Sequence, residues 1–188
     1  MNKRELRKKI LNIRNNMNKE DVVEKSKIIM QKIINTEAYK KSNTIFIYMD
    51  FKNEVITSFL INQMISENKS VMIPYTDVEN INIIPVEIHN LEQDLKRCSF
   101  GYLEPKKELI TPVDLKIIDL IIVPGVVFDR KLNRIGFGKG YYDRILSKKR
   151  SDTKAIAIAY EFQVLNEIPH EEHDIKMDMI VTEEKIYN

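Results

Sequence analysis

Apolar residues recur at helical spacing near the beginning of the chain, at positions i, i+4, i+7 and i+11. This pattern predicts an amphipathic helix over residues 2–17 with a buried apolar stripe. The stripe consists of Leu6, Ile10, Ile13 and Met17. Asn18-Lys19-Glu20 interrupts the pattern, and we expect further helices over residues 19–35 and 56–67.

Short apolar runs between and after these helices predict β-strands. They cover residues 44–49, 71–74, 81–88, 117–123, 154–160 and 179–182, of which the last is expected to be the final strand. Pro85 is expected to interrupt the third run, because proline cannot donate to a strand ladder. Residues 89–116 contain Pro105 and scattered charge, and we expect loops with little regular structure there.

The alternation of short strands with helices predicts an α/β fold, in which helices cover both faces of a mainly parallel sheet. Ligands bind such sheets beyond the carboxyl ends of the strands. Three segments leave predicted strands at that edge, and we expect them to converge on one site. They are the glycine-rich segment after residues 117–123, residues 49–54, and Tyr160-Glu161.

Residues 134–143 (Arg-Ile-Gly-Phe-Gly-Lys-Gly-Tyr-Tyr-Asp) are the most informative segment and hold three of the five glycines. Closely spaced glycines let backbone N–H groups approach a ligand. Arg134 and Lys139 supply charge suited to phosphate, and Asp143 is suited to a hard cation. A helix expected over residues 141–149 completes a phosphate-binding arrangement. The spacing matches neither the P-loop nor the dinucleotide-binding pattern, so a structural loop is the alternative.

Cations border the apolar stripe of the first predicted helix. Lys3, Arg7 and Arg14 fall beside the stripe, so their stems can lean on the core while their charged ends reach an adjoining cleft. Arg4 falls towards the back of the helix, together with Lys8 and Lys9. The alternative is a basic helix that is simply solvated.

Composition limits the function classes. Thirty basic and 28 acidic residues leave a net charge of +2, and no aromatic platform accompanies the basic helix, so nucleic-acid binding is not expected. No apolar run approaches the roughly 20 residues of a membrane span, and no secretory signal is recognisable. Cys98 is the only cysteine, which favours a reducing compartment. We expect a soluble, cytoplasmic monomer.

Four segments resemble the 5-formyltetrahydrofolate cyclo-ligase family, also called 5,10-methenyltetrahydrofolate synthetase. Residues 123–129 (Val-Pro-Gly-Val-Val-Phe-Asp) and 133–144 are similar to the family signature. Residues 3–7 (Lys-Arg-Glu-Leu-Arg) resemble its basic opening, and residues 168–174 with Met177-Asp178 resemble its closing motif. 

One position departs from the family pattern. Leu132 stands where the family usually has a turn glycine. We expect the next residue, Asn133, to take the positive-φ conformation instead, because asparagine tolerates it better than most residues.

The resemblance implies a three-layer α/β/α fold related to the sugar-phosphate isomerase and CoA-transferase group. It implies one domain over residues 1–188, with helix 2–17 packed against the nucleotide site. The implied substrates are 5-formyltetrahydrofolate and ATP, with Mg²⁺ as the metal. The expected ATP-binding residues are Lys3, Arg4, Arg7, Arg14, Arg134, Gly136, Gly138, Lys139, Gly140, Tyr141 and Tyr142. The expected folate-binding residues are Met49, Glu54, Phe137 and Tyr141, the expected metal ligands are Asp143 and Asp174, and the expected catalytic residues are Lys139 and Arg134.

The implied reaction uses ATP to activate a poor leaving group, the oxygen of a formamide. The γ-phosphoryl group passes to the formyl oxygen, N10 attacks the formyl carbon, and phosphate leaves. Phosphoryl transfer relies on positioning and charge neutralisation rather than on a protein nucleophile. This agrees with the absence of a convincing Ser-His-Asp or Cys-His set in the sequence.

Several side chains keep a second interpretation. Asp50 or Asn53 would be able to cap the following helix, and Asp178 would be able to act as a structural cap. His170 and His173 have a spacing that suits a metal, although their surroundings indicate a surface loop. Further candidates are Pro74-Tyr75 as a wall of the site and Tyr142 as a core residue.

Three other functions remain possible from the sequence. A sugar-phosphate isomerase or acyl-CoA transferase on the same fold would use Glu161 as a carboxylate base. A non-catalytic folate or nucleotide sensor would keep the pocket without turnover. A nucleic-acid adaptor would use the basic first helix.

Overall fold

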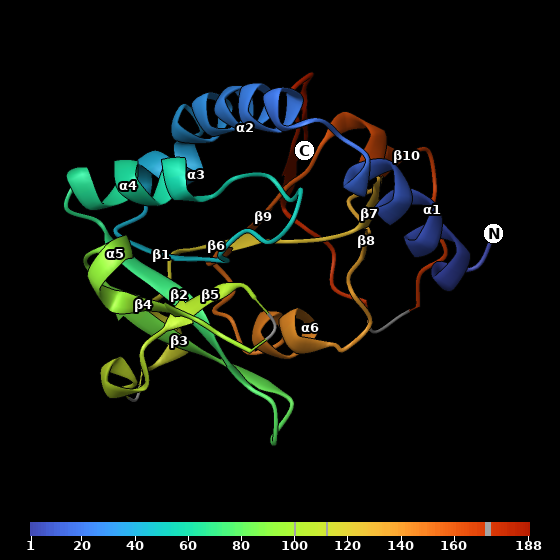
Figure 1. The fold of residues 1–188 in the computed structure, drawn as a ribbon. Helices are drawn as coiled ribbons and strands as arrows, with labels where there is room; N and C mark the ends of the chain where they lie inside the picture. Colours follow the sequence, from blue (N-terminus) through green and yellow to red (C-terminus); the bar gives the residue numbers. More distant parts are fainter. Residues whose placement is uncertain (100, 112, 172–173) are drawn as a thin grey trace.

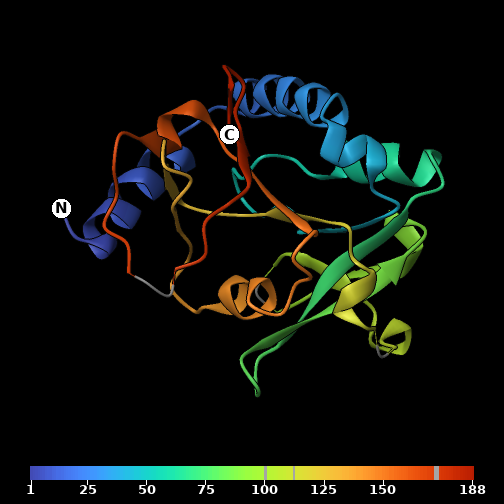
Figure 2. The same ribbon diagram turned by 180° about the vertical axis from the view of Figure 1, so that it is seen from behind.

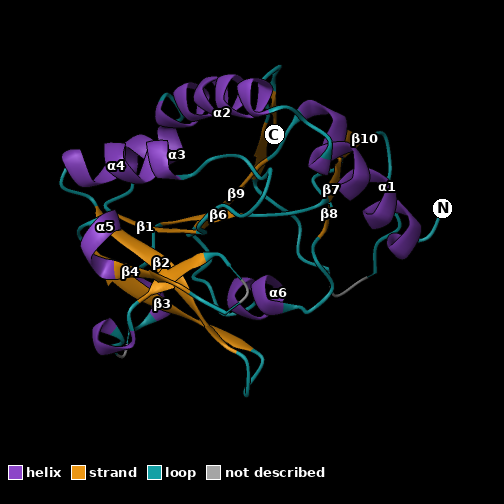
Figure 3. Cartoon of the chain, in the orientation of Figure 1, coloured by secondary structure: helices purple, strands orange, loops and turns teal. Residues whose placement is uncertain are grey.

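The computed structural model describes residues 1–99, 101–111, 113–171 and 174–188. Its α-helices are α1 (Lys3–Asn15), α2 (Lys19–Ile34), α3 (Glu37–Lys41), α4 (Ser58–Ser66), α5 (Leu91–Asp94) and α6 (Tyr141–Leu146). Three short 3₁₀ helices cover Lys107–Leu109, Leu115–Ile117 and Glu161–Gln163. Figure 3 shows how these helices surround the strands.

The main sheet has seven strands in the order β12-β11-β9-β6-β1-β2-β3. The five inner strands run parallel, whereas both edge strands are antiparallel to their neighbours. The strands are β1 (Thr44–Ile47), β2 (Ser70–Asp77), β3 (Asn82–Ile88), β6 (Leu120–Val123), β9 (Lys154–Ile158), β11 (Met179–Val181) and β12 (Ile186–Tyr187).

Helices α2, α3 and α4 lie on one side of this sheet and α6 lies on the other, in both views of the ribbon (Figures 1 and 2). This arrangement confirms the predicted three-layer α/β/α class with a mainly parallel central sheet. Successive side chains of a strand point to opposite faces of the sheet. Each face can therefore bury apolar side chains against one layer of helices.

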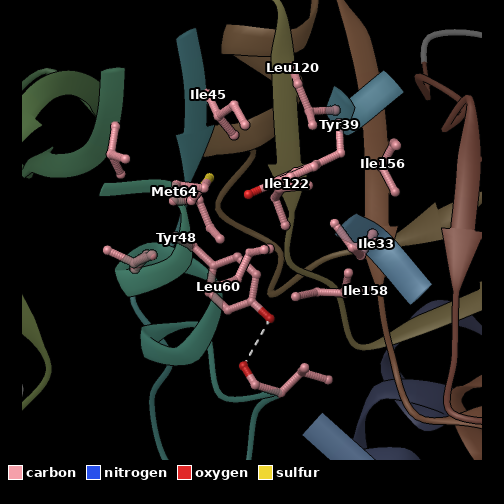
Figure 4. Packing of buried hydrophobic residues seen from close by; sticks show 14 of the residues in the cluster. Ile33, Tyr39, Ile45, Tyr48, Leu60, Met64, Leu120, Ile122, Ile156 and Ile158 are labelled. Carbon is pink, nitrogen blue, oxygen red and sulfur yellow. Dashed lines mark hydrogen bonds between the residues drawn. The ribbon is translucent and has the colours of Figure 1, made fainter. Parts of the chain in front are cut away.

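The two faces of the sheet carry separate cores. In β1, Ile45 and Ile47 join the cluster beneath α2, α3 and α4, whereas Phe46 faces the cluster that contains α6. Figure 4 shows strand residues of the first cluster, such as Ile122 and Ile156, facing residues from the helices above them. Both faces are apolar, which is why these strands read as continuous hydrophobic runs.

A small sheet lies beside the main one and was not anticipated from the sequence. Strands β10 (Val164–Leu165), β7 (Val127–Asp129) and β8 (Arg134–Ile135) form it in that order. Helix α1 packs on it through a third apolar cluster that includes Leu6 and Ile10 (Figure 1). This sheet therefore places the basic helix next to the segment that follows β8.

The buried face of α1 differs from the predicted stripe. Leu6 and Ile10 are buried as expected, but Ile13 is 41% exposed and Arg14 is only 4% exposed. At about 100° per residue, the buried face is rotated by about 30° towards the cationic edge of the helix. The cause is the neighbouring Glu54, whose carboxylate pairs with Arg14.

Three expectations about strands and loops were wrong. Strand β3 is not interrupted at Pro85, because Pro85 lies opposite Pro74 and neither residue has an N–H to donate. Residues 89–116 contain regular structure: α5, the hairpin of β4 (Leu95–Arg97) and β5 (Leu103–Pro105), and two 3₁₀ turns. The final strand is β12 rather than residues 179–182, since Ile186–Tyr187 adds an antiparallel edge to β11.

The turn before β8 also differs from the expectation. Leu132 itself adopts a positive φ of 69°, whereas Asn133 is not among the residues with positive φ. The Asn133 backbone N–H donates to Asp129 Oδ1 (3.0 Å), and its side-chain amide donates to Asp129 Oδ2 (2.9 Å). Asn133 is held by this pair of hydrogen bonds, so the left-handed residue is the leucine that precedes it.

Candidate active site

A cavity of about 450 Å³ opens at the carboxyl ends of β1, β2 and β6. Its walls come from α1, from the segment after β1, from residues 134–143 and from the β4–β5 hairpin. Two of the three segments predicted to converge at this edge do so. The third does not, because neither Tyr160 nor Glu161 is among the residues that line the cavity.

The glycine-rich segment forms one wall. Gly138 and Gly140 have φ values of 95° and 71°, a conformation that side chains with a Cβ disfavour. Gly140 is the N-cap of α6, and the segment begins at β8. The predicted strand-loop-helix order is therefore present. The strand, however, is β8 of the small sheet and not the predicted strand over residues 117–123. The helix is also shorter than predicted, ending at Leu146.

Helix α1 is attached to the glycine-rich segment through Arg7. Arg7 Nε donates to the carbonyl oxygen of Gly136 (2.7 Å), and the Arg7 guanidinium lies 3.6 Å from the position of a Cβ at Gly138. Lys3, Arg7 and Lys139 all line the cavity. The expectation that cationic ends of the first helix reach an adjoining cleft is met by Lys3 and Arg7.

Two acidic residues expected to bind metal are paired with two cations expected to bind nucleotide. Arg134 forms an ion pair with Asp143, and its Nη1 also donates to the Pro124 carbonyl oxygen (3.2 Å). Lys3 forms an ion pair with Asp174 (2.7 Å). All four side chains line the cavity, where Arg7 and Lys139 add further positive charge to these two ion pairs.

The ion pair of Lys3 changes its titration. Burial lowers the pKa of Lys3, but hydrogen bonds and charges from Asp174 and Glu171 outweigh burial and raise this pKa. Lys3 therefore stays charged.

Among the described residues, no three His, Cys, Asp or Glu side chains gather into a metal-binding group. A magnesium ion needs fewer, because it keeps several waters and takes one or two carboxylates together with substrate phosphates.

Glu54 is an acid of the cavity wall whose pKa is strongly raised. Burial raises the pKa of Glu54 from its usual 4.5 to about 7, although the charge of Arg14 and the Phe51 N–H oppose this rise. The Phe51 N–H donates to Glu54 Oε2 (3.0 Å), and Arg14 lies 3.7 Å from Oε1. This carboxylate is therefore held from both sides, and it gains a proton within the neutral range.

The wall around Glu54 is apolar and aromatic. Met49, Phe137, Tyr141 and Tyr142 line the cavity as predicted, and so does Pro74, but not Tyr75. Sequence reasoning missed further lining residues from the segment after β1, from β2 and β3, and from the hairpin. They are Tyr48, Phe51, Thr76, Ile83, Tyr102 and Leu103. 

Two of the missed residues lie in the hairpin that the sequence did not predict. Tyr102 and Leu103 belong to the stretch that was expected to be loop, and the Tyr102 hydroxyl donates to Thr76 Oγ1 (3.1 Å) across the rim. Phe51 meets the Tyr102 ring edge-on, with ring centroids 5.9 Å apart.

Other residues considered from the sequence lie outside the cavity. Arg4 is exposed, and Arg14 is buried behind the cavity wall. Asp178 accepts a hydrogen bond from the Ala155 N–H (2.8 Å), which is a structural role. His170 is exposed, and His173 is outside the described residues, so a site between these two histidines has no structural test.

Glu161 has a structural role. It accepts hydrogen bonds from the hydroxyls of Thr182 (2.6 Å) and Tyr187, and it pairs with Lys185 (3.2 Å). Burial alone would raise the pKa of Glu161, but these partners lower it. A carboxylate in this position is no base for a sugar-phosphate isomerase.

Asp50 and Asn53 do not cap α4 as considered above. The N-cap residue of α4 is Thr57. Asp50 Oδ1 accepts from the Thr57 backbone N–H (2.9 Å), while the Asn53 side chain donates to the carbonyl of Arg14 at the end of α1 (2.9 Å). 

The fold and the cavity define a class: an α/β protein whose parallel strands end at a cavity that combines a cationic glycine-rich wall with an aromatic, acid-containing wall. Comparison with known proteins gives the family. The model of the 5-formyltetrahydrofolate cyclo-ligase family matches residues 1–183. The chain therefore belongs to this family of ligases, which convert 5-formyltetrahydrofolate to 5,10-methenyltetrahydrofolate with ATP.

Individual relatives agree over most of their length. The 5-formyltetrahydrofolate cyclo-ligase of Mus musculus is 30% identical over 173 residues, covering 88% of this chain and 85% of the mouse protein. The probable 5-formyltetrahydrofolate cyclo-ligase of Schizosaccharomyces pombe is 33% identical, and the match covers 84% of this chain and 83% of the yeast protein. The NMR structure of Aquifex aeolicus 5,10-methenyltetrahydrofolate synthetase has 34% identity and a TM-score of 0.86, and covers 100% of this chain and 93% of its own. The resemblance noted from the sequence is confirmed.

Within the described ranges, no helix is both long enough and apolar enough to span a bilayer.

Proposed function

We propose that this chain performs the cyclo-ligase reaction in the cavity described above, with ATP at the glycine-rich wall and the folate against the aromatic wall. The observation that carries this assignment is that one cavity joins both walls. Lys139 and Arg7 face the proposed phosphate region, and Gly138 and Gly140 leave backbone donors open there. Aromatic and apolar side chains opposite them suit a flat pterin ring.

The folate region centres on Glu54. Its carboxylate accepts hydrogen bonds from the N–H groups of the pterin, while Met49 packs against the ring face. This places the formyl group between Glu54 and the cations of the opposite wall. Phe137 and Tyr141 extend the flat apolar surface.

The chemistry follows from charge and position. The γ-phosphoryl group of ATP transfers to the formyl oxygen, forming a C–O–P linkage and releasing ADP. N10 then attacks the activated carbon and loses its proton, and the C–O bond breaks to release phosphate and close the ring. Arg134 and Lys139 neutralise the charge that develops on the phosphoryl oxygens, the usual role of cations in phosphoryl transfer.

The carboxylates of Asp143 and Asp174 fit a magnesium ion by their chemistry. Hard oxygen ligands suit Mg²⁺, and both carboxylates are now paired with cations that phosphate can recruit instead. Arg134 and Lys3 would move their charge to the nucleotide, and the two acids would then hold the ion. A bound Mg²⁺ supplies further neutralisation of the phosphates.

The other proposals about the whole protein rest on weaker features. We propose that residues 1–188 form one domain with α1 as part of the nucleotide site, because Lys3 and Arg7 line the cavity. We propose a reducing compartment such as the cytoplasm, because Cys98 is the only cysteine. We also propose a monomer, because the sequence has no heptad pattern and no obvious interface stripe.

The test is turnover of 5-formyltetrahydrofolate with ATP and Mg²⁺, followed by the near-ultraviolet absorbance of the conjugated methenyl product. We expect an ATP-dependent rise, and its absence would refute the assignment. Thermal stabilisation by both substrates without turnover would indicate a ligand sensor instead.

Lys139→Ala tests the proposed phosphate wall. We expect kcat to fall by a factor of at least about 10², the scale of losing one donor to a transition-state charge. Lys148→Ala is the matched control, since Lys148 is an exposed lysine outside the cavity. A near-normal rate for Lys139→Ala would remove Lys139 from the mechanism.

A further inference from the structure

Arg14 is a buried cation that does not line the cavity. Its side chain is 4% exposed. The guanidinium lies 3.7 Å from Glu54 Oε1, its Nη1 is 3.5 Å from the Gly125 carbonyl oxygen, and its Cζ is 5.5 Å from the centre of the Phe137 ring. Burying a charged side chain costs free energy unless the charge is paired and hydrogen-bonded. Solvation does not explain the position of Arg14, so its contacts need another explanation.

The ion pair between Arg14 and Glu54 is poorly arranged to stabilise the fold. Its separation of 3.7 Å is long, and Arg14 Nε is buried without a hydrogen-bond partner among the described residues. Buried ion pairs with incomplete hydrogen bonding often stabilise a fold less than apolar residues of similar size. A function at the neighbouring cavity accounts better for this arrangement.

The segment that carries Glu54 is attached to α1 at a second point. Asn53, the residue before Glu54, donates its side-chain amide to the carbonyl oxygens of Arg14 (2.9 Å) and Met17 (3.0 Å). These carbonyl groups lie at the C-terminal end of α1 and just after it. Helix α1 therefore fixes both the backbone beside Glu54 and one oxygen of its carboxylate.

The opposite end of α1 contacts the glycine-rich wall. Arg7 donates to the Gly136 carbonyl oxygen, and the Phe137 ring of the same wall lies beside the Arg14 guanidinium. One helix thus connects the wall proposed for the phosphates with the acid proposed for the pterin. Arg14 is the residue of α1 that touches both Glu54 and Phe137.

We propose that Arg14 is a positioning residue for folate binding: it orients the Glu54 carboxylate towards the pterin from behind the cavity wall, and its positive charge favours the charged form of that carboxylate. This proposal rests on the proposed function, because it takes Glu54 to be a folate contact. It replaces the expectation that Arg14 binds ATP with a role in the folate half of the site.

The charges around Glu54 explain why Arg14 matters. Burial raises the pKa of Glu54, the positive charge of Arg14 lowers it, and the carboxylate of Asp50 raises it. The other groups that face Glu54 are the neutral phenols of Tyr48 and Tyr142, and the Tyr160 hydroxyl donates to the Glu54 carbonyl oxygen (3.1 Å). Arg14 is thus the cation that favours the ionised form of this acid against burial and Asp50.

The decisive measurement is the affinity for 5-formyltetrahydrofolate, without ATP, from about pH 6 to about pH 9. In the unchanged protein we expect affinity to fall as pH drops through about 7, where Glu54 gains its proton. In Arg14→Met this fall should begin at a higher pH. Each pKa unit of upward movement lowers the affinity near pH 7 by a factor of up to about ten.

Two comparisons separate positioning from mere structure. Arg14→Lys keeps the charge and should return the pH midpoint most of the way to that of the unchanged protein. Asn53→Ala removes the second attachment to α1 without changing a charge, so it should lower stability and leave the midpoint unchanged. Lys9→Met, which removes an exposed cation of the same helix, should change neither property.

The outcomes are distinguishable from those of the proposed function. If the unchanged protein turns over its substrates and folded Arg14→Met has the same pH midpoint, the role of Arg14 is refuted while the function stands. If Arg14→Met does not fold, Arg14→Lys and the pair Glu54→Gln and Arg14→Met/Glu54→Gln decide the question. Glu54→Gln and Arg14→Met/Glu54→Gln should then bind the folate about equally, because residue 54 no longer titrates, and a marked further loss of affinity in the double variant would overturn the proposal.

Discussion

The titration of Glu54 should make the stability of this protein depend on pH in a range where few other groups titrate. The pKa of Glu54 is raised by burial from 4.5 to about 7, so the folded protein holds this proton more tightly than the unfolded chain. Folding is therefore favoured by protonation. The contribution is fully present below about pH 4.5 and is lost as pH rises through about 7.

The magnitude follows from the two pKa values. Their difference corresponds to roughly 3 kcal/mol in the free energy of unfolding. Most of this, about 2–3 kcal/mol, should be lost between pH 5 and pH 8. Acids with lowered pKa values, such as Asp119 and Glu161, act in the opposite sense and at lower pH, so they leave this window nearly clear.

The assay is urea denaturation of the unchanged protein and of Glu54→Gln at several pH values from about 5 to about 8. Glutamine keeps the size and an acceptor for the Phe51 N–H, but it does not titrate. Glu54→Gln leaves Arg14 without its carboxylate, so its absolute stability will differ. The prediction concerns the slope, and parallel curves for the two proteins across this window would refute the reasoning.

Two further substitutions test packing and hydrogen bonding. Gly125→Ala should lower the free energy of unfolding by about 1–3 kcal/mol, because an added Cβ would lie 2.2 Å from Phe128 Cζ. Phe128→Leu in the same chain should recover part of that cost in urea denaturation, and a fully stable Gly125→Ala would contradict the contact. Tyr142→Phe should leave the free energy of unfolding unchanged or raise it by up to about 1 kcal/mol, because the buried Tyr142 hydroxyl has no hydrogen-bond partner among the described residues. Weaker binding of either substrate by Tyr142→Phe would show that this hydroxyl contacts the ligand, whereas a marked loss of stability would show a missed internal partner.

Much of the fold was predictable because its signals are local. Helices α1, α2 and α4 and strands β1, β6 and β9 follow hydrophobic periods that extend over several turns or residues, whereas the five-residue helix α3 was not predicted. The glycine-rich wall is contiguous in sequence, so its backbone and its charges could be identified together. Elements were missed where they are short and depend on distant partners, as in β7, β8 and β10, which have two or three residues each.

The sequence by itself determined the α/β class, the anion-suited segment at 134–143 and the family resemblance, because periodicity and contiguous motifs are properties of the chain. Only the tertiary structure decided which partners these groups have. It paired Arg134 with Asp143, turned Arg14 inward to Glu54, and brought the hairpin carrying Tyr102 to the cavity rim. The last two contacts join residues far apart in sequence, the first depends on how the glycine-rich segment folds, and burial then shifts the pKa of Glu54. No local pattern encodes either effect.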